Sequence, residues 1–420
     1  MTTAQAGASL IQQALGSLSP ILVANFALSQ AQLGIVFSAI LFGAACCTAL
    51  AGALTDRWGE RRMLLGSAAV MTLALLGATL SATYPWLVAM MVCYGAGYAS
   101  STPAGGRAVL AWFDRDRGFA MGVRQTGVSI GALVGALGLP PVASGFGYRG
   151  AFVFAALLVV LPSVLAFALY RESADVTSAP ATLRSLARGM GTLMRDRRLI
   201  AVTLTCMLLS ATQFVMAAFV TITAVQVVHT SVHLAGLVLA AGFVGAICGR
   251  LGWGIVSDRF FCGDRLIPLA IIAVLAATAS AMLAFAGAGA VLPLFAAGLL
   301  LGVSAAGWNG LMAAALSEIG GPERAASALG LGLTGIFAAS AVAPWLFGCV
   351  ADRWSLHWAW ALMAILCFAA TAPVVWLRMR SGARQVVPAP GLQQGDGQAN
   401  PTEMERASER REGLGAECRR

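Results

Sequence analysis

Two arginines inside otherwise apolar stretches are the side chains of this sequence best suited to do chemistry. Arg250 lies in GAICGRLGWGIVSDR, eight residues before Asp258, and Arg124 lies in MGVRQTG. A guanidinium stays charged in a dry site, and its planar fork binds a carboxylate through two hydrogen bonds. These residues therefore predict contact with an anion. Two alternatives remain: Arg250 pairs with backbone carbonyls or with Asp258, and Arg124 joins Asp114 and Asp116 in the charge network of a neighbouring loop.

Acidic side chains are missing from the middle of the apolar stretches. The eighteen aspartates and glutamates map to loops, to the ends of apolar runs or to the C-terminal tail, and the three histidines fall in or beside loops. A proton relay through a buried carboxylate therefore has no candidate. The nine cysteines have neither metal nor redox spacing. We expect no metal, no cofactor and no enzyme, because an enzyme would need a catalytic cluster or a folded soluble domain.

Uncharged polar residues add candidates for a binding site. The GWNG stretch supplies a tryptophan and an asparagine, and glutamines and tyrosines are scattered over other apolar runs. Hydrogen bonding between helices is the alternative role for each of them. The full set of predicted substrate contacts is Arg250, Arg124, Gln125, Gln213, Trp308, Asn309, Tyr98 and Gln13.

Long helices must position these residues. The chain is 59% hydrophobic and 11% charged, whereas a soluble domain is about 25% charged, and its mean hydropathy is +0.80. A helix needs about 20 apolar residues to cross a bilayer, and it satisfies its own backbone hydrogen bonds there. Twelve such runs occur, at approximately 7–28, 33–54, 63–83, 86–111, 118–141, 149–170, 199–222, 235–257, 267–287, 290–315, 325–348 and 357–377. The sequence predicts an all-α membrane protein with twelve transmembrane helices in contact with the lipid bilayer.

The distribution of arginine predicts the orientation. The net charge is +9 and the chain has no lysine. Alternate loops hold fourteen arginines, Arg57, Arg61, Arg62, Arg115, Arg117, Arg171, Arg184, Arg188, Arg195, Arg197, Arg198, Arg259, Arg265 and Arg324. The opposite loops hold only Arg149 and Arg353. Loops rich in arginine stay on the cytoplasmic side, so we expect a protein of the bacterial inner membrane with both termini in the cytoplasm. Because the positive charge lies in these loops, we expect no nucleic acid partner.

An internal duplication divides the chain. GALTDRWGERR, from Gly52, recurs as GIVSDRFFCGDR, from Gly254, and further landmarks repeat at offsets of 204 and 208 residues. Each copy holds six predicted spans. We therefore predict an N-terminal six-helix half over 1–170, a cytoplasmic connector over 171–198, a C-terminal half over 199–378 and a disordered cytoplasmic tail over 379–420.

The first copy of the repeated loop resembles a family signature. Two six-helix halves joined by a cytoplasmic loop are similar to the major facilitator superfamily of secondary transporters, whose signature between the second and third helices is roughly G-x-L-x-D-R-x-G-R-R. This chain departs from it mainly at Glu60. The resemblance implies that the loop forms a latch against the other half and holds one state of the gate. The predicted gating residues are Gly52, Asp56, Arg57, Gly59, Arg61, Arg62, Asp258 and Arg259; anchoring in the cytoplasm is the alternative.

The same resemblance suggests where the substrate binds. In this family the site lies near the bilayer midplane between the halves. The pattern Arg250-x-x-x-Gly254-x-x-x-Asp258 resembles the eighth helix of monocarboxylate and related organic-anion carriers. We therefore expect transport of a small organic anion by alternating access, with a co-transported proton as one option for coupling and no obligate protein partner. Proton-coupled efflux of drugs or neutral metabolites is the alternative.

Glycines bear on that alternative. Gly127, Gly131 and Gly135 recur at every fourth residue, which predicts a face for close helix contact. Drug–proton antiporters usually add a Gly-Pro pair in this region, and VSIGALVG has none. Exporters of lipophilic cations also commonly hold a carboxylate in the membrane. Both differences favour the anion carrier.

Overall fold

A computed structural model describes residues 2–99, 117–169, 195–261 and 263–381. Helices and short turns make up these residues, and no strand occurs among them. The helices are α1 (Thr2–Ala14), the 3-10 helix η1 (Leu15–Leu18), α2 (Ser19–Phe26), α3 (Gln30–Trp58), α4 (Glu60–Thr79), α5 (Tyr84–Tyr98), α7 (Arg117–Leu169), α9 (Arg197–Gln226), α10 (Val232–Phe260), α11 (Leu266–Ala284), α12 (Val291–Val303), α13 (Asn309–Arg353), α14 (Leu356–Ala369) and α15 (Thr371–Ser381). The predicted all-α class is confirmed.

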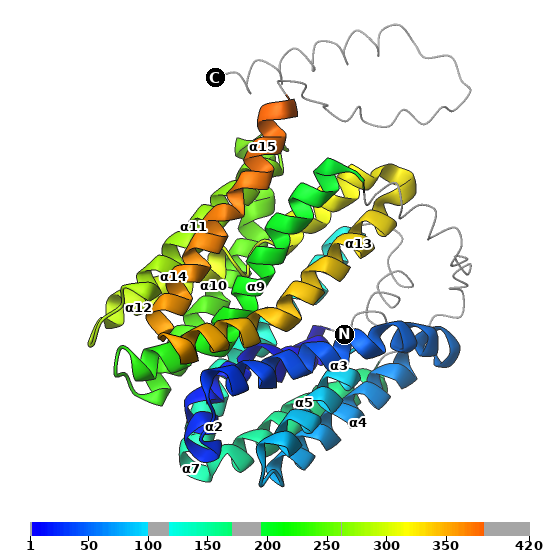
Figure 1. Ribbon diagram of the computed structural model, residues 1–420. Helices are drawn as coiled ribbons and strands as arrows, with labels where there is room; N and C mark the ends of the chain where they lie inside the picture. Colours follow the sequence, from blue (N-terminus) through cyan, green and yellow to red (C-terminus); the bar gives the residue numbers. More distant parts are fainter. Residues whose placement is uncertain (1, 100–116, 170–194, 262, 382–420) are drawn as a thin grey trace, which may run out of the picture.

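The described helices form two groups. Figure 1 shows α1 to α7 in one group and α9 to α15 in the other. We call these groups the N half and the C half. They meet where α3 packs on α13, where α7 packs on α10, and where the first span packs on α9. The predicted connector, apart from its last residues, and the predicted tail beyond Ser381 lie outside the described residues.

Nine helical segments among the described residues are long and apolar enough to cross a membrane. Two assigned helices are too long for a single crossing. Helix α7 breaks at Gly147, whose φ of 68° interrupts the helix between two predicted spans. Helix α13 has 45 residues, which at 1.5 Å each gives about 68 Å, over twice the thickness of the hydrocarbon core. Every predicted run overlaps a described helix, and the count of twelve crossings stays a prediction.

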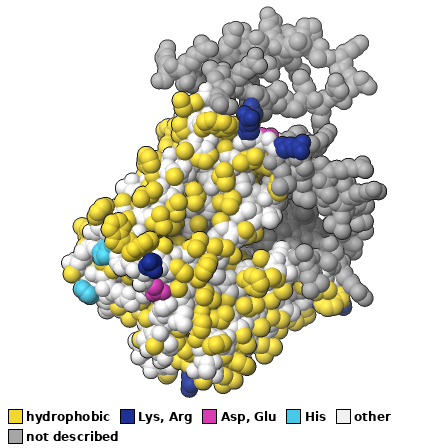
Figure 2. Space-filling view, in the orientation of Figure 1, with side chains coloured by type: hydrophobic (Ala, Val, Ile, Leu, Met, Phe, Trp, Pro, Cys, Tyr) yellow, Lys and Arg dark blue, Asp and Glu magenta, His cyan; other side chains and the backbone are white. Residues whose placement is uncertain are grey.

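The surface fits a multi-pass membrane protein. Large apolar side chains such as Leu73, Leu161 and Ile365 are mostly exposed along the helices, and Figure 2 shows hydrophobic side chains spread over the described face of the molecule. Several exposed tryptophans lie near helix ends, among them Trp58 and Trp354, as expected for residues at a membrane–water boundary.

Glycines set the closest helix contacts. A Cβ atom at Gly131 would lie 1.9 Å from the carbonyl oxygen of Ala6, and one at Gly127 would lie 2.5 Å from that of Thr2. At Gly135 a Cβ atom would instead meet side chains of α1, with Ala14 Cβ at 2.6 Å. The predicted packing face in the fifth span is therefore confirmed, and its partner is the first span. Helices α10 and α12 make a second contact of this kind, where Gly302 lies against the backbone of Gly242.

Candidate functional site

Two spans are interrupted at the level of the site. The first changes from α1 to the 3-10 helix η1 and then to α2. In the tenth, α12 ends at Val303 and α13 begins at Asn309, with turns over residues 304–308. Such breaks are tolerated in a membrane only where protein or a cavity satisfies the freed backbone groups, and transporters build sites at them.

The break between α12 and α13 is held by side chains that donate to its carbonyl oxygens. Trp308 Nε1 donates to Ala305 O at 2.7 Å, and Asn309 Nδ2 donates to Ala306 O at 3.3 Å. Helix α10 contributes Trp253, whose indole donates to Val303 O at 2.8 Å. The two predicted contacts from GWNG thus bind the backbone of their own break in this structure.

Arg250 completes this set of donors. Its Nε donates to the carbonyl oxygen of Ala306 at 3.1 Å. Asp258 lies further along α10 and pairs with Arg265 Nη1 at 2.5 Å instead. Of the two alternative partners for Arg250, the backbone carbonyl is therefore present, and the carboxylate of Asp258 is bound to another arginine.

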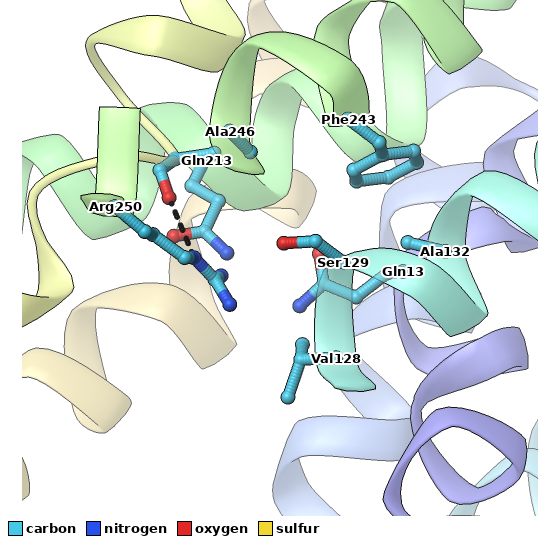
Figure 3. Close-up of a pocket in the computed structure, with 9 residues that line it drawn as sticks. Gln13, Val128, Ser129, Ala132, Gln213, Phe243, Ala246 and Arg250 are labelled. Carbon is cyan, nitrogen blue, oxygen red and sulfur yellow. Dashed lines mark hydrogen bonds between the residues drawn. The ribbon is translucent and has the colours of Figure 1, made fainter. Parts of the chain in front are cut away.

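A narrow cavity lies in front of Arg250, between the two halves. Figure 3 shows the guanidinium pointing from α10 toward Gln13 and Ser129 of the N half, with Gln213 of α9 beside it. The cavity contains about 160 Å³ of empty space, even when space open to solvent is counted. This is below the roughly 300–1,000 Å³ of most small-molecule sites, so the described state is constricted. The lining residues are Gln13, Val128, Ser129, Ala132, Gln213, Phe243, Ala246, Arg250 and Ala306.

Two polar atoms of the lining are buried without a partner. Within the described part of the chain, neither Gln13 Oε1 nor Ser129 Oγ makes a hydrogen bond. Both side chains are almost completely buried. Leaving such an atom unpaired costs about 1–3 kcal/mol. Both oxygens therefore keep an unused hydrogen-bond acceptor position beside the cavity.

The structure brings together part of the predicted substrate contacts. Gln13, Gln213 and Arg250 line one cavity, and Tyr98, at the end of α5, lies within electrostatic range of Arg250. The side chains of Arg124 and Gln125 lie outside the described residues.

Sequence reasoning missed Ser129 and Phe243. Ser129 lies one helical turn after Gln125 in the same apolar run, so the spacing i, i+4 would have flagged it. Phe243 lies seven residues before Arg250 on α10 and therefore shares its face of that helix.

The predicted gating residues lie at the ends of helices. Gly59 forms the turn between α3 and α4 with a φ of 81°, which explains a glycine at this place in the signature. Arg61 Nε donates to Phe167 O at 2.7 Å, and its guanidinium lies 4.1 Å from the centre of the Phe167 ring, within the N half. Arg62 is exposed. The side chains of Asp56 and Arg57, and the surroundings of Gly52, lie outside the described residues, so the latch stays a prediction.

The second copy of the loop forms an ionic cluster in the C half. Arg265 binds Asp258 and also Glu318 of α13, the latter from Nε at 3.1 Å. Arg378 of α15 pairs with Asp264 in the same region. Partial burial lowers the pKa of Arg265, but hydrogen bonds and attraction from Asp258 and Glu318 outweigh burial, so the net shift is upward. Arg259 is exposed beside this cluster.

Comparison with known proteins identifies relatives over most of the chain. The model of the Major Facilitator Superfamily matches residues 1–227 and 203–401. An uncharacterized transporter of this type from Mycobacterium tuberculosis is 30% identical over 335 residues, which span 78% of this chain and 72% of the relative.

Other similarities are shorter or more distant. A fujikurins efflux protein of Gibberella fujikuroi is 24% identical over 210 residues, 50% of this chain and 44% of that protein. A 3-(3-hydroxy-phenyl)propionate transporter of Escherichia coli is 32% identical over 129 residues, 30% of this chain and 31% of that protein. Among solved structures, an inward-facing, occupied bacterial homolog of the human lysosomal transporter Spinster has a TM-score of 0.74 at 15% identity, covering 90% of this chain and 95% of that chain. This last likeness concerns the fold alone.

Proposed function

This chain belongs to the major facilitator superfamily of transporters, and from that premise we propose that it carries a small organic anion across the membrane. The anion would bind in the cavity between the halves, and the halves would expose that cavity to each side in turn. Gln13 and Ser129 come from the N half, whereas Gln213 and Arg250 come from the C half. A relative movement of the halves would therefore change the contacts of a ligand that is bound by residues of both halves.

The position of Arg250 carries the proposal. A permanently charged guanidinium lies at a cavity between the halves, and no carboxylate is among the described residues that line it. Its Nε is fixed by Ala306 O, which orients the guanidinium plane. An oriented fork suits a carboxylate, since both oxygens can bind at once.

The rest of the lining favours a carboxylate with a small apolar body. Phe243, Val128, Ala132 and Ala246 supply apolar contacts beside the polar side chains. The Escherichia coli relative is named as a transporter of an aromatic carboxylate, which has this combination of groups. A monocarboxylate is therefore the substrate class that we favour.

Efflux of a neutral metabolite is the second candidate. The Gibberella fujikuroi relative is named as an efflux protein, and the amides of Gln13 and Gln213 can bind neutral groups. In that case Arg250 would serve only to hold the break between α12 and α13. The two candidates differ in whether a negative charge on the ligand is required.

Membrane location, orientation and coupling are proposed from the sequence. We propose that the protein lies in the bacterial inner membrane with both termini in the cytoplasm, on the strength of the arginine distribution. The sequence leaves three modes of coupling open: a proton carried by the weak acid itself, a proton bound near Arg250, and exchange of one anion for another. The signature loop would act as the latch that the family resemblance implies, holding one state of the gate on the cytoplasmic side.

A thermal-shift screen tests the substrate class. Full-length protein in detergent would be heated with small mono- and dicarboxylates, neutral sugars or lipophilic cations, and Arg250→Ala would be run beside the wild type. A ligand at 100 times its dissociation constant stabilises a protein by about 2.7 kcal/mol. A shift with carboxylates that disappears in the variant supports the anion carrier. A shift only with neutral or cationic compounds would replace it with the efflux candidate.

A further inference from the structure

One carboxylate joins the two halves directly. Asp352, in the last turn of α13, accepts a hydrogen bond from the backbone N–H of Gln30 through Oδ1 at 2.7 Å and from that of Ala31 through Oδ2 at 2.8 Å. These two donors are the first two residues of α3, in the N half. The contact therefore joins residues more than 300 positions apart in the sequence and crosses the interface between the halves.

The contact completes the N-terminus of α3. The first four N–H groups of a helix have no partner inside it. Ser29 caps α3: its Oγ accepts from the N–H of Gln32 at 3.2 Å, and its own N–H donates to Oε1 of Gln32 at 3.0 Å. The two remaining groups, on Gln30 and Ala31, bind Asp352. A negative charge at a helix N-terminus is also favoured by the helix dipole.

Glycines let the two helices approach at the same place. A Cβ atom at Gly34 would lie 2.2 Å from the carbonyl oxygen of Pro344, and one at Gly348 would lie 2.2 Å from that of Gln30. These distances leave no room for a side chain at either glycine. The backbones of α3 and α13 are therefore in direct contact at Gly34 and at Gly348. Gln30 Nε2 adds a bond to Gln226 Oε1 of α9 at 3.2 Å.

Other contacts between the halves lie at this end of the molecule. We call it the arginine-poor end, because the loops that the sequence analysis assigns to it hold only Arg149 and Arg353. In the first span, Ser19 Oγ donates to Ala218 O of α9 at 2.9 Å. Helix α10 approaches α7 where Gly236 faces the carbonyl oxygen of Ala136. The halves are therefore closed together at the arginine-poor end.

The duplication allows the contact of α3 with α13 to be compared with the contact of α7 with α10, and the carboxylate belongs only to the first. With the offset that relates Arg149 to Arg353, the counterpart of Asp352 is Tyr148. The hydroxyl of Tyr148 donates to Ser81 O within the N half and does not reach the start of α10. The contact of α7 with α10 thus lacks the charged bond that α13 makes with α3.

We propose that Asp352 is the latch of the gate at the arginine-poor end. The gate is the contact of residues 30–34 with residues 344–352. When the halves separate at this end, Gln30 and Ala31 lose their partner and Asp352 loses both hydrogen bonds at once. The latch therefore favours the closed gate, and the proposal does not depend on which substrate the cavity takes.

Hydrogen exchange of the backbone amides tests the latch without any ligand. The full-length protein in detergent would be compared as wild type and as Asp352→Asn, which keeps the size of the side chain but removes its charge and one acceptor. From the energy of a charge at a helix terminus, we expect the gate to open roughly two- to fivefold more often. Exchange should then rise in residues 30–34 and also in residues 232–240 at the start of α10, which lie in a separate contact between the halves.

Two further variants make the result decisive. Arg353→Gln removes the neighbouring exposed charge and should leave exchange in both segments as in the wild type. Gly34→Leu should open both segments because its side chain cannot fit against Pro344. If Asp352→Asn raises exchange only within residues 30–34, Asp352 is a local helix cap and the proposal is wrong. If Gly34→Leu opens both segments and Asp352→Asn opens neither, the gate exists and Asp352 does not latch it.

Discussion

The guanidinium of Arg250 and the carbonyl oxygen of Ala306 join two helices at the point where one of them is broken. The bond of 3.1 Å ties α10 to the turns between α12 and α13. An arginine in a membrane span is costly, and a carbonyl freed from a helix is costly too. Each reduces the cost of the other, and together they orient the guanidinium toward the cavity.

A glycine in the same break should be needed to position Arg250. A Cβ atom at Gly307 would lie 2.2 Å from Val303 O and 2.8 Å from Gly249 Cα. We expect Gly307→Ala to destabilise the protein by about 1–3 kcal/mol, because backbone atoms must move apart, and to weaken carboxylate binding as Arg250 shifts. Thermal unfolding and ligand-induced shifts measure both effects.

Gly310 supplies the matched control. A Cβ atom there would meet only Arg250 O, at 3.6 Å, which is an ordinary contact. Gly310→Ala should leave the unfolding temperature close to that of the wild type. Its dissociation constant for the carboxylate should stay within about twofold of the wild-type value. Equal behaviour of the two variants would show that the close contact at Gly307 is unimportant.

Ser129 should have opposite effects on stability and binding. Its Oγ is buried without a partner among the described residues, so Ser129→Ala removes a polar atom that costs about 1 kcal/mol or more. The free protein should become more stable by that amount, while its affinity for a carboxylate should fall about three- to tenfold. Thermal unfolding with and without ligand separates the two.

Ser163→Ala is the corresponding control. The Oγ of Ser163 is also buried but donates to Val159 O at 2.7 Å. Its removal loses a satisfied bond and should lower stability by about 1 kcal/mol, with ligand affinity unchanged. If Ser129→Ala also lowered stability and left affinity unchanged, Ser129 would have no part in a site.

Asp258 should be dispensable for anion binding. Its carboxylate is exposed and pairs with the partly buried Arg265 rather than with Arg250, and such a pair near the surface is worth about 0–1 kcal/mol. Asp258→Asn should therefore leave the carboxylate-induced thermal shift within the error of the wild type. A shift that disappears would mean that Asp258 and Arg250 act together, which was the alternative open from the sequence.

Much of the fold was predictable because membrane helices have a strong signal in the sequence. Apolar runs located the helices, and the repeated loop divided them into two halves, so Gln13, Gln213 and Arg250 could be assigned to facing spans. Their meeting in one cavity follows from that arrangement.

The features that could not be predicted from the sequence depend on hydrogen bonds to backbone groups. The breaks at residues 15–18 and 304–308 are held by tertiary bonds, such as the one from Trp253 to Val303 O. Asp352 stood among the acids at span ends, and its partners are two backbone N–H groups far away in the sequence. Backbone donors leave no residue pattern, so neither feature can be read from residue types.

Uptake into proteoliposomes tests the central claim most directly. Wild type, Arg250→Ala and Arg250→Lys would be compared with Arg198→Ala, which removes an exposed arginine at the start of α9. The labelled substrate would be the carboxylate that gives the largest thermal shift. We predict that Arg250→Ala abolishes uptake, that Arg250→Lys retains a small fraction because an ammonium cannot bind both oxygens, and that Arg198→Ala is unaffected. Full uptake by Arg250→Ala, at equal protein in the membrane, would contradict the account.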